Sequence, residues 1–149
     1  MGAICARGKT DLVFIEGTLN AQKYINILEN HLLPKMKQLY KQDAYKFMQD
    51  HATAYDSNIT QSWLSQNLEQ FFGKEEWHAK SPDLNAIENL WSILEDKIDR
   101  QKVKSKSDLK KSLAKAWNSI KIEELQKLIS SMPNRRSEVR ASKGGYTKY

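Results

Sequence analysis

The chain has 149 residues, the usual size of a single globular domain with one core. Its 24 Lys and Arg residues exceed its 18 Asp and Glu residues, and the net charge of +6 favours a polyanionic partner, although a solvated lysine-rich surface explains the charge equally well. The single cysteine, Cys5, excludes an internal disulfide and a cysteine-based zinc cluster, and without a long apolar run or a secretory signal no membrane span is expected.

The first residues predict two antiparallel strands. Residues Gly2–Ala6 form a short apolar run, and a turn at Arg7-Gly8-Lys9 leads into a second run, Asp11–Gly17. Glycine at the turn and at the end of the second run is typical of a hairpin.

A helix is expected next, followed by a third strand. Asn20 can cap the helix, and its apolar residues recur at helical spacing until Pro34, which is expected to stop it: Tyr24, Ile27, Leu28 and Leu32. The segment Tyr45–Asp50 then has the pattern of a strand. Its last residue is a carboxylate at a strand end, where α/β folds tend to place chemistry.

The remainder of the chain is expected to be mostly helical. A helix is predicted from Asp56 or Asn58 to about Asn67, and Glu75–Ala79 is a weaker strand prediction. The clearest helix follows Ser81-Pro82, with an apolar stripe: Ile87, Leu90, Trp91, Leu94 and Ile98. Two further helices have apolar positions at Leu109–Ile120 and Ile122–Met132, and Pro133 is expected to end the pattern.

This order of elements predicts an α/β fold with a mixed sheet and a helical C-terminal end. We expect a domain over residues 1–133 and a basic tail over residues 134–149. The tail has few apolar residues, so it is expected to be extended or mobile, or to fold on a partner.

Several ordered segments resemble one protein family. Residues Ser81–Trp91 read SPDLNAIENLW, which resembles the SPDLNPIENLW signature of Tc/mariner transposases. Four other pieces follow the family's order: Leu12–Asn20 ahead of Tyr24, Leu28–Pro34, Met48–Asp50, and Ser131–Pro133 followed by Lys143–Gly145. The resemblance covers almost the whole chain.

The resemblance implies a ribonuclease H-like fold with three carboxylates that hold Mg²⁺ or Mn²⁺. Asp50 matches the second family carboxylate and Glu88 matches the third, and 37 residues lie between them. The family's first catalytic Asp lies on a strand before Gly2–Ala6, so that strand and that carboxylate are expected to be missing here. Asp11 and Asp43 stand in no matching motif.

Carboxylates suit this chemistry because Mg²⁺ prefers oxygen ligands and keeps open positions for water and phosphate oxygens. Two ions about 4 Å apart can activate the attacking oxygen and stabilise the leaving oxygen. In the family, water cuts the transposon end and the freed 3′-hydroxyl then attacks target DNA.

Each assigned carboxylate also has a purely structural interpretation. Glu88 lies three residues after Asn85, the spacing of a capping box, and Asp50 could simply accept turn hydrogen bonds. On local pattern alone the structural interpretation of Glu88 is preferred, and the surrounding signature reverses that preference. Asp83 is assigned to a cap or turn.

Other conspicuous side chains are assigned to packing or solvent. His51 and His78 form no recognisable zinc pair, and Trp91 and Trp117 lie on apolar stripes, which favours a core position over base stacking. A basic cluster is equally compatible with phosphate binding and with a solvated face: Lys102, Lys104, Lys106, Lys110, Lys111 and Lys115.

Two substitutions depart from the family pattern: Ala86 replaces the usual proline, and Tyr55 stands where histidine often occurs. The helix-turn-helix domains of the family are also not recognised. The sequence is therefore interpreted as part of a DNA transposase catalytic domain that is inactive alone, with non-specific DNA as partner. A non-catalytic DNA-binding or structural remnant is the alternative. For the complete protein the resemblance implies nuclear action, and a homodimer is possible.

Overall fold

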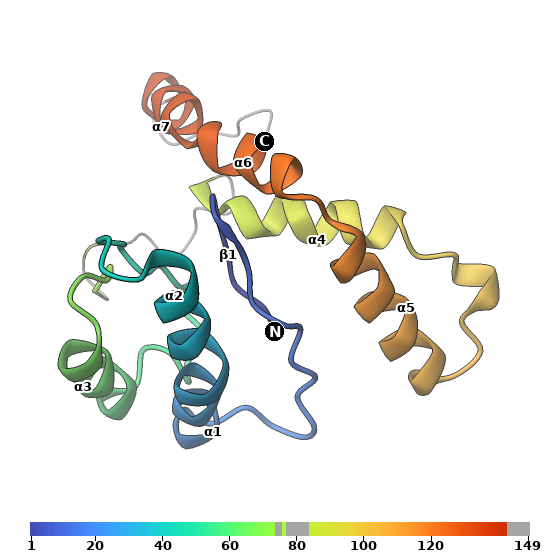
Figure 1. Ribbon diagram of the computed structural model, residues 1–149, viewed down its shortest axis with the longest axis horizontal. Coiled ribbons are helices and arrows are strands. Elements are labelled where there is room, and N and C mark those ends of the chain that lie inside the picture. Colours follow the sequence, from blue (N-terminus) through green and yellow to red (C-terminus); the bar gives the residue numbers. More distant parts are fainter. Residues whose placement is uncertain (74–75, 77–83, 143–149) are drawn as a thin grey trace. The chain divides into compact units, whose positions relative to one another are not determined.

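The computed structural model describes residues 1–73, 76 and 84–142 (Figure 1). The chain divides into two compact units. The first unit comprises Met1 and Val13–Lys80, and the second comprises Gly2–Leu12 and Ser81–Tyr149. Within the described residues, none of the helices combines the length and the apolar character that crossing a membrane requires.

The first unit begins with a continuous helical segment made of α1 (Ala21–Ile27), the π-helical turn η1 (Leu28–Leu32) and α2 (Leu33–Tyr40). The predicted cap is confirmed, because Asn20 Oδ1 accepts a hydrogen bond from Lys23 N at 2.9 Å. The predicted stop at Pro34 is wrong. The π turn, in which Leu33 N–H donates to Leu28 O, widens the helix just before the proline, where a regular helix would clash with the ring.

The second helix of this unit, α3 (Asn58–Asn67), packs against α1. Its N-cap is Ser57, whose Oγ accepts from Thr60 N at 3.3 Å, and this cap places the helix start within the predicted range. Leu64 and Thr60 are fully buried, whereas Ile59 is 63% exposed. The core of the unit therefore lies on the face of α3 that meets α1.

Of the predicted strand at Tyr45–Asp50, the described residues show one parallel bridge, between Phe47 and Phe71. Phe47 N donates to Gln70 O, and Phe72 N donates to Phe47 O, both at 2.9 Å. Among the described residues these two bonds do not continue into a ladder. Of the weakly predicted strand at residues 75–79, Glu76 is described and lies in a turn, and the rest lies outside the described residues.

The second unit contains the hairpin. Strands β1 (Ile4–Cys5) and β2 (Gly8–Lys9) pair antiparallel, with Ile4 opposite Lys9. The turn is confirmed, but the partner strand is Gly8–Lys9 and not Asp11–Gly17. Backbone bonds between the two arms of the hairpin continue to Val13, whose N and O both bond Met1, and β2 itself ends at Lys9.

Helices make up most of the described remainder of the second unit. They are α4 (Ala86–Asp96), the short 3-10 turn η3 (Arg100–Lys102), α5 (Lys106–Ser119), α6 (Ile122–Ser130) and α7 (Met132–Ala141). The expected helical end is confirmed. The expectation of an extended tail after Pro133 is wrong as far as Ala141, because proline in the first turn of a helix forfeits no intrahelical hydrogen bond and instead begins α7.

An apolar cluster holds the second unit together around Trp117, which is 1% exposed. The cluster also contains Leu90, Leu94 and Leu125. Trp117 stacks on Trp91 with ring centroids 5.6 Å apart, and its Nε1 donates to Thr10 O at 2.8 Å. The packing interpretation of both tryptophans is confirmed, and the indole donor ties α5 to the residue that follows β2.

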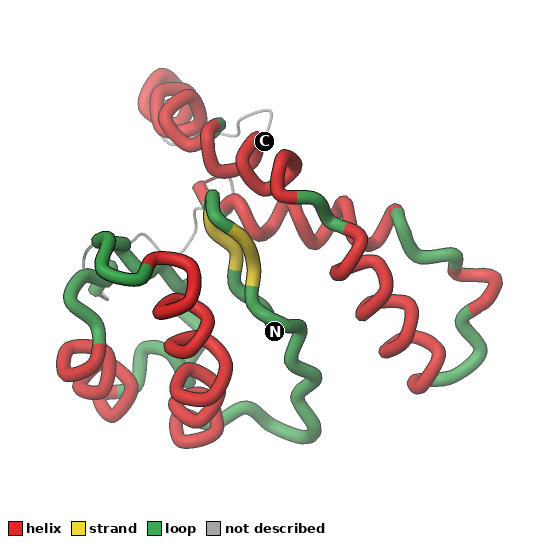
Figure 2. The backbone as a smooth tube through the Cα atoms, in the orientation of Figure 1, coloured by secondary structure: helices red, strands yellow, loops and turns green. Residues whose placement is uncertain are grey.

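The mixed sheet expected from the sequence is small within the described residues. Figure 2 shows the two short strands of the hairpin beside a predominance of helix. The expected sheet requires several neighbouring strands, and in the described residues the Phe47 segment contributes a single bridge. The described residues therefore contain more of the expected helices than of the expected sheet.

Candidate active site

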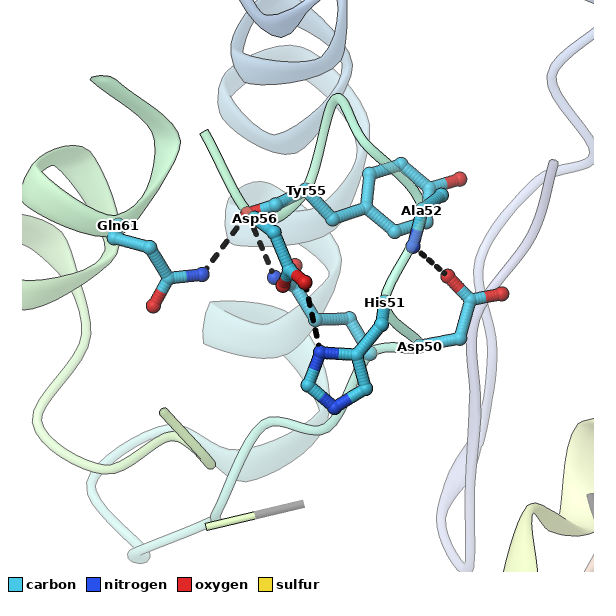
Figure 3. A network of polar contacts seen from close by, with 7 residues as sticks. Asp50, His51, Ala52, Tyr55, Asp56 and Gln61 are labelled. Atoms are coloured by element: carbon cyan, nitrogen blue, oxygen red, sulfur yellow. Dashed lines mark hydrogen bonds and ion pairs between the residues drawn. The ribbon is translucent and has the colours of Figure 1, made fainter. Parts of the chain in front are cut away.

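Asp50 lies at the end of the extended Phe47 segment, in an exposed position. Its Oδ1 accepts a hydrogen bond from Ala52 N at 3.1 Å (Figure 3). This is the turn bond that the structural interpretation of Asp50 predicted. Because a carboxylate has about four acceptor positions, one backbone bond orients Asp50 and leaves most of its capacity to accept other ligands.

Gln49 anchors the backbone beside Asp50. Its Oε1 accepts from the Tyr24 hydroxyl at 2.7 Å, and its Nε2 donates to Tyr55 O at 3.2 Å. Gln61 Nε2 donates to the same carbonyl at 2.9 Å. The residue before Asp50 is thus fixed to α1 and to the loop that leads into α3. Sequence reasoning missed Gln49, which carries no chemistry and is identified only by its contacts.

A histidine–carboxylate pair follows Asp50 directly. His51 Nδ1 and Asp56 Oδ2 are 2.8 Å apart, and their side chains are 15% and 19% exposed. In Figure 3 this pair holds the two ends of the loop that also carries Tyr55. The contact links the two ends of the loop and so stabilises it. His78 lies outside the described residues.

The two tyrosines near Asp50 pack against each other with their ring planes tilted by 31°. The rings of Tyr24 and Tyr55 have centroids 4.1 Å apart. Burial, together with the negative charge of Asp50, raises the pKa of Tyr55 to about 12. Burial also raises the pKa of Tyr24 well above its usual value, with smaller contributions from Tyr55 and Asp50. Both phenols therefore stay protonated at neutral pH, and the Asp50 charge lies within electrostatic reach of both.

Glu88 lies in the first turn of α4 and is exposed. The capping-box alternative is not realised, because the Asn85 side chain makes no cap hydrogen bond and the Glu88 carboxylate bonds no described residue. Ala86 and Leu90 on the neighbouring face are buried, so the helix directs Glu88 away from the core. A carboxylate near a helix N-terminus is also favoured by the helix dipole.

The chemistry of both carboxylates suits a hard divalent cation, since each offers uncommitted oxygens. Asp50 belongs to the first unit and Glu88 to the second. Among the described residues no three His, Cys, Asp or Glu side chains gather closely enough to hold a metal. Asp83 lies outside those residues. The assignment of Asp50 and Glu88 as metal ligands therefore remains a prediction.

The basic cluster lies on η3, α5 and the residues between them. Lys104, Lys106, Lys111 and Lys115 are exposed, and the ammonium group of each forms no hydrogen bond or salt bridge with a described residue. Lys102 is engaged by Asp99 at 2.8 Å. Within the described part of the chain, four cations without a salt-bridge partner are therefore available for an anionic ligand.

Comparisons with known proteins agree on one family. The model described as DDE superfamily endonuclease matches residues 1–110. The Tc3 transposase of Caenorhabditis elegans is 32% identical over 150 residues, which cover 99% of this chain and 44% of that protein. The Tcb1 transposase of Caenorhabditis briggsae is 32% identical over 135 residues, covering 91% and 48%. The chain thus spans less than half the length of these relatives.

Solved structures show the same fold. The Mos1 transposase catalytic domain with raltegravir and Mn matches with a TM-score of 0.77 and 21% identity, covering 99% of this chain and 82% of that one. The Mos1 mariner paired-end complex with Mn matches with a TM-score of 0.72 and 23% identity, covering 88% and 38%. The ribonuclease H-like fold is confirmed in outline.

Proposed function

Because the chain belongs to the DDE superfamily endonucleases, within the Tc/mariner transposases, we propose that it forms part of a catalytic domain that cuts and joins DNA. The observation that carries the proposal is the pair Asp50 and Glu88. Both stand at the family's motif positions, both are exposed, and both keep oxygens that bond no described residue. The first strand and first carboxylate of the family are assigned to no residue of this chain.

Asp50 and Glu88 are the residues that would hold Mg²⁺ or Mn²⁺. Mos1 structures contain either Mg or Mn, which supports the same cations here. When bound, such ions activate the attacking oxygen and stabilise charge on the phosphate. The chain's own contribution is orientation: the Ala52 N–H and Gln49 hold the Asp50 segment, and α4 holds Glu88 on a rigid support.

Calorimetric titration with Mn²⁺ tests this assignment. We expect Asp50→Asn and Glu88→Gln each to weaken binding at least tenfold, since each removes a charged ligand. Asp96→Asn is the matched control, because Asp96 is an exposed carboxylate at the far end of the same helix. Equal loss in all three variants, or no binding by a folded chain, would contradict the metal site.

With two recognisable carboxylates, the chain alone is expected to bind metal without cutting DNA. Nicking of a supercoiled plasmid in the presence of Mn²⁺ measures whether the chain cuts DNA, and no nicking is expected. Nicking by both the unaltered chain and Asp50→Asn would rule out the assigned site.

DNA is the proposed partner, since the Mos1 paired-end complex supports it and exposed lysines on and before α5 offer phosphate contacts. The fit is to backbone phosphates and not to base sequence. DNA binding, measured by fluorescence anisotropy, should weaken as the salt concentration rises. The double variant Lys111→Gln, Lys115→Gln should reduce the slope of log K against log salt by about 0.9 for each phosphate that is no longer neutralised. An unchanged slope would favour the solvated-face alternative.

Nuclear action and a homodimer are proposed for the complete protein. Fluorescence imaging of a tagged chain and sedimentation analysis are the corresponding measurements. A cytoplasmic signal or a strictly monomeric complete protein would refute them.

A further inference from the structure

Among the described residues, no side chain caps the start of α4. The Asn85 side chain makes no cap hydrogen bond, and Ala86 stands where proline would preorganise the first turn. Leu90 and Leu94 anchor the helix further along, with 0% and 1% exposure. The turn that carries Glu88 therefore depends on tertiary contacts for its position.

A buried arginine on α7 supplies such a contact. Arg135 is 2% exposed. Its Nε donates to Ser131 Oγ at 2.7 Å, and its Nη1 donates to Asn89 Oδ1. Asn89 directly follows Glu88 in the first turn of α4. The guanidinium thus ties α7 to the turn that carries the candidate metal ligand.

The stability of α4 and α7 alone does not explain why Arg135 is buried next to the first turn of α4. Burying a guanidinium costs desolvation energy, which only good hydrogen bonds offset. A cation beside a helix N-terminus is also disfavoured by the helix dipole. The contact nevertheless fixes the rotation of α4 about its axis, because Asn89 is held by its side-chain oxygen while Leu90 is held in the core.

We infer that Arg135 is a positioning residue, which acts through Asn89 to set the direction in which Glu88 presents its carboxylate. The inference rests on the proposed role of Glu88 in metal binding. Successive helical residues are separated by about 100° of rotation, so clamping Asn89 and Leu90 determines where Glu88 points. Arg135 itself touches neither metal nor DNA in this scheme.

Three variants and one matched control test the inference in the full chain. Arg135→Met and Asn89→Leu break the tether, and Arg135→Lys keeps a charged donor. Arg136→Met is the control, because it removes the same charge from the adjacent, exposed position. Circular dichroism establishes that each variant is folded, and if Arg135→Met does not fold, Asn89→Leu and Arg135→Lys decide the question.

Hydrogen exchange reports the local effect. In Arg135→Met and Asn89→Leu we expect the amides of residues 89 and 90 to exchange about tenfold faster or more, the scale of one hydrogen bond to a charged group. The amides of Leu94 and Leu125 should keep their rates, as should all amides in Arg136→Met. Unchanged rates at residues 89 and 90, or an equal rise at all four amides, would overturn the inference.

Mn²⁺ calorimetry reports the effect on Glu88. Arg135→Met should weaken Mn²⁺ binding about tenfold, and Arg135→Lys should recover part of that loss. In a Glu88→Gln background, Arg135→Met should cause no further loss of Mn²⁺ binding. Additive losses would mean a general structural role and overturn the inference. If the unaltered chain binds no Mn²⁺, the proposed metal site fails, and the exchange rates alone decide whether Arg135 sets the turn.

Discussion

The two units support their candidate carboxylates in different ways. In the first unit Asp50 ends an extended segment that is held by polar contacts, chiefly Gln49 bonded to Tyr24 and Tyr55. In the second unit Glu88 sits on a helix anchored in an apolar cluster around Trp117. Apolar burial is nondirectional and large, whereas hydrogen bonds are directional and contribute less net stability. The Asp50 segment should therefore be the more sensitive of the two to loss of a polar group, and the body of α4 the more sensitive to loss of a core side chain.

The largest effect should come from Trp117→Ala. The change removes a buried indole from the centre of the cluster, together with its bond to Thr10 O, and we expect a loss of about 3–5 kcal/mol in the free energy of unfolding. Urea unfolding followed by circular dichroism measures it.

Trp63→Ala in the first unit is the comparison for that result. Trp63 is half-buried and donates to Glu29 Oε1 at 2.9 Å, so its loss should cost less than half as much. Similar losses for the two tryptophans would erase the proposed contrast between the units.

Gly2→Ala should be the next most harmful change. A Cβ at Gly2 would stand 2.6 and 2.8 Å from two ring atoms of Trp117. Because the buried ring cannot move freely, β1 must shift, and overpacking of this kind costs about 1–3 kcal/mol. In the double variant Gly2→Ala, Trp117→Phe the loss should be less than the sum of the two single losses in the same unfolding assay, because the smaller ring relieves the clash. A neutral Gly2→Ala would mean that the first strand adjusts without cost.

Gln49→Leu probes the polar support of the first unit. It leaves the hydroxyl of Tyr24, which is 3% exposed, without the acceptor 2.7 Å away, and an unsatisfied buried donor costs about 1–3 kcal/mol. Adding Tyr24→Phe removes that donor, so the double variant should be more stable than Gln49→Leu alone. If the double variant is the less stable of the two, the hydroxyl is satisfied in another way.

Helices and their caps were the most predictable part of the fold. Asn20, the stripe of α4 from Ile87 to Leu94 and the tryptophans of the core follow from local spacing and were confirmed, whereas Ile98, the last residue of the predicted stripe, lies beyond the end of α4 at Asp96. The predicted helix ends at the two prolines were wrong, because a proline can lie after a π turn, as Pro34 does, or in the first turn of a new helix, as Pro133 does. Neither outcome is encoded in the residues next to the proline.

The sheet and the supports of the site could not be predicted locally. Whether Tyr45–Asp50 forms a strand depends on what lies beside it, and among the described residues Phe71 alone forms a bridge with it. The motif identified Asp50 and Glu88, whereas Gln49 and Arg135 are recognisable only through contacts with residues distant in sequence. Long-range hydrogen bonds leave no periodic signal.

Alkaline pH should produce the smallest change in the free energy of unfolding, and the change should have opposite signs for a group in each unit. In the first, burial and the Asp50 charge raise the pKa of Tyr55 to about 12, above the usual value near 10. Above pH 10 the unfolded chain therefore loses this proton first, and stability falls until about pH 12. The loss should be on the order of 1 kcal/mol, since Tyr55 is partly exposed and screened.

In the second unit burial lowers the pKa of Lys9, partly offset by Glu124. The charged amine is therefore disfavoured in the folded state, and the penalty is relieved as pH rises towards the usual lysine value. Urea unfolding at pH 9, 10 and 11 measures both trends. Tyr55→Phe should lessen the fall in stability, of which the part due to the raised pKa of Tyr24 remains, whereas Lys9→Met should steepen it, since the rise that opposes the fall is removed. If both variants followed the pH profile of the unaltered chain, neither group would be the source of a difference between the units.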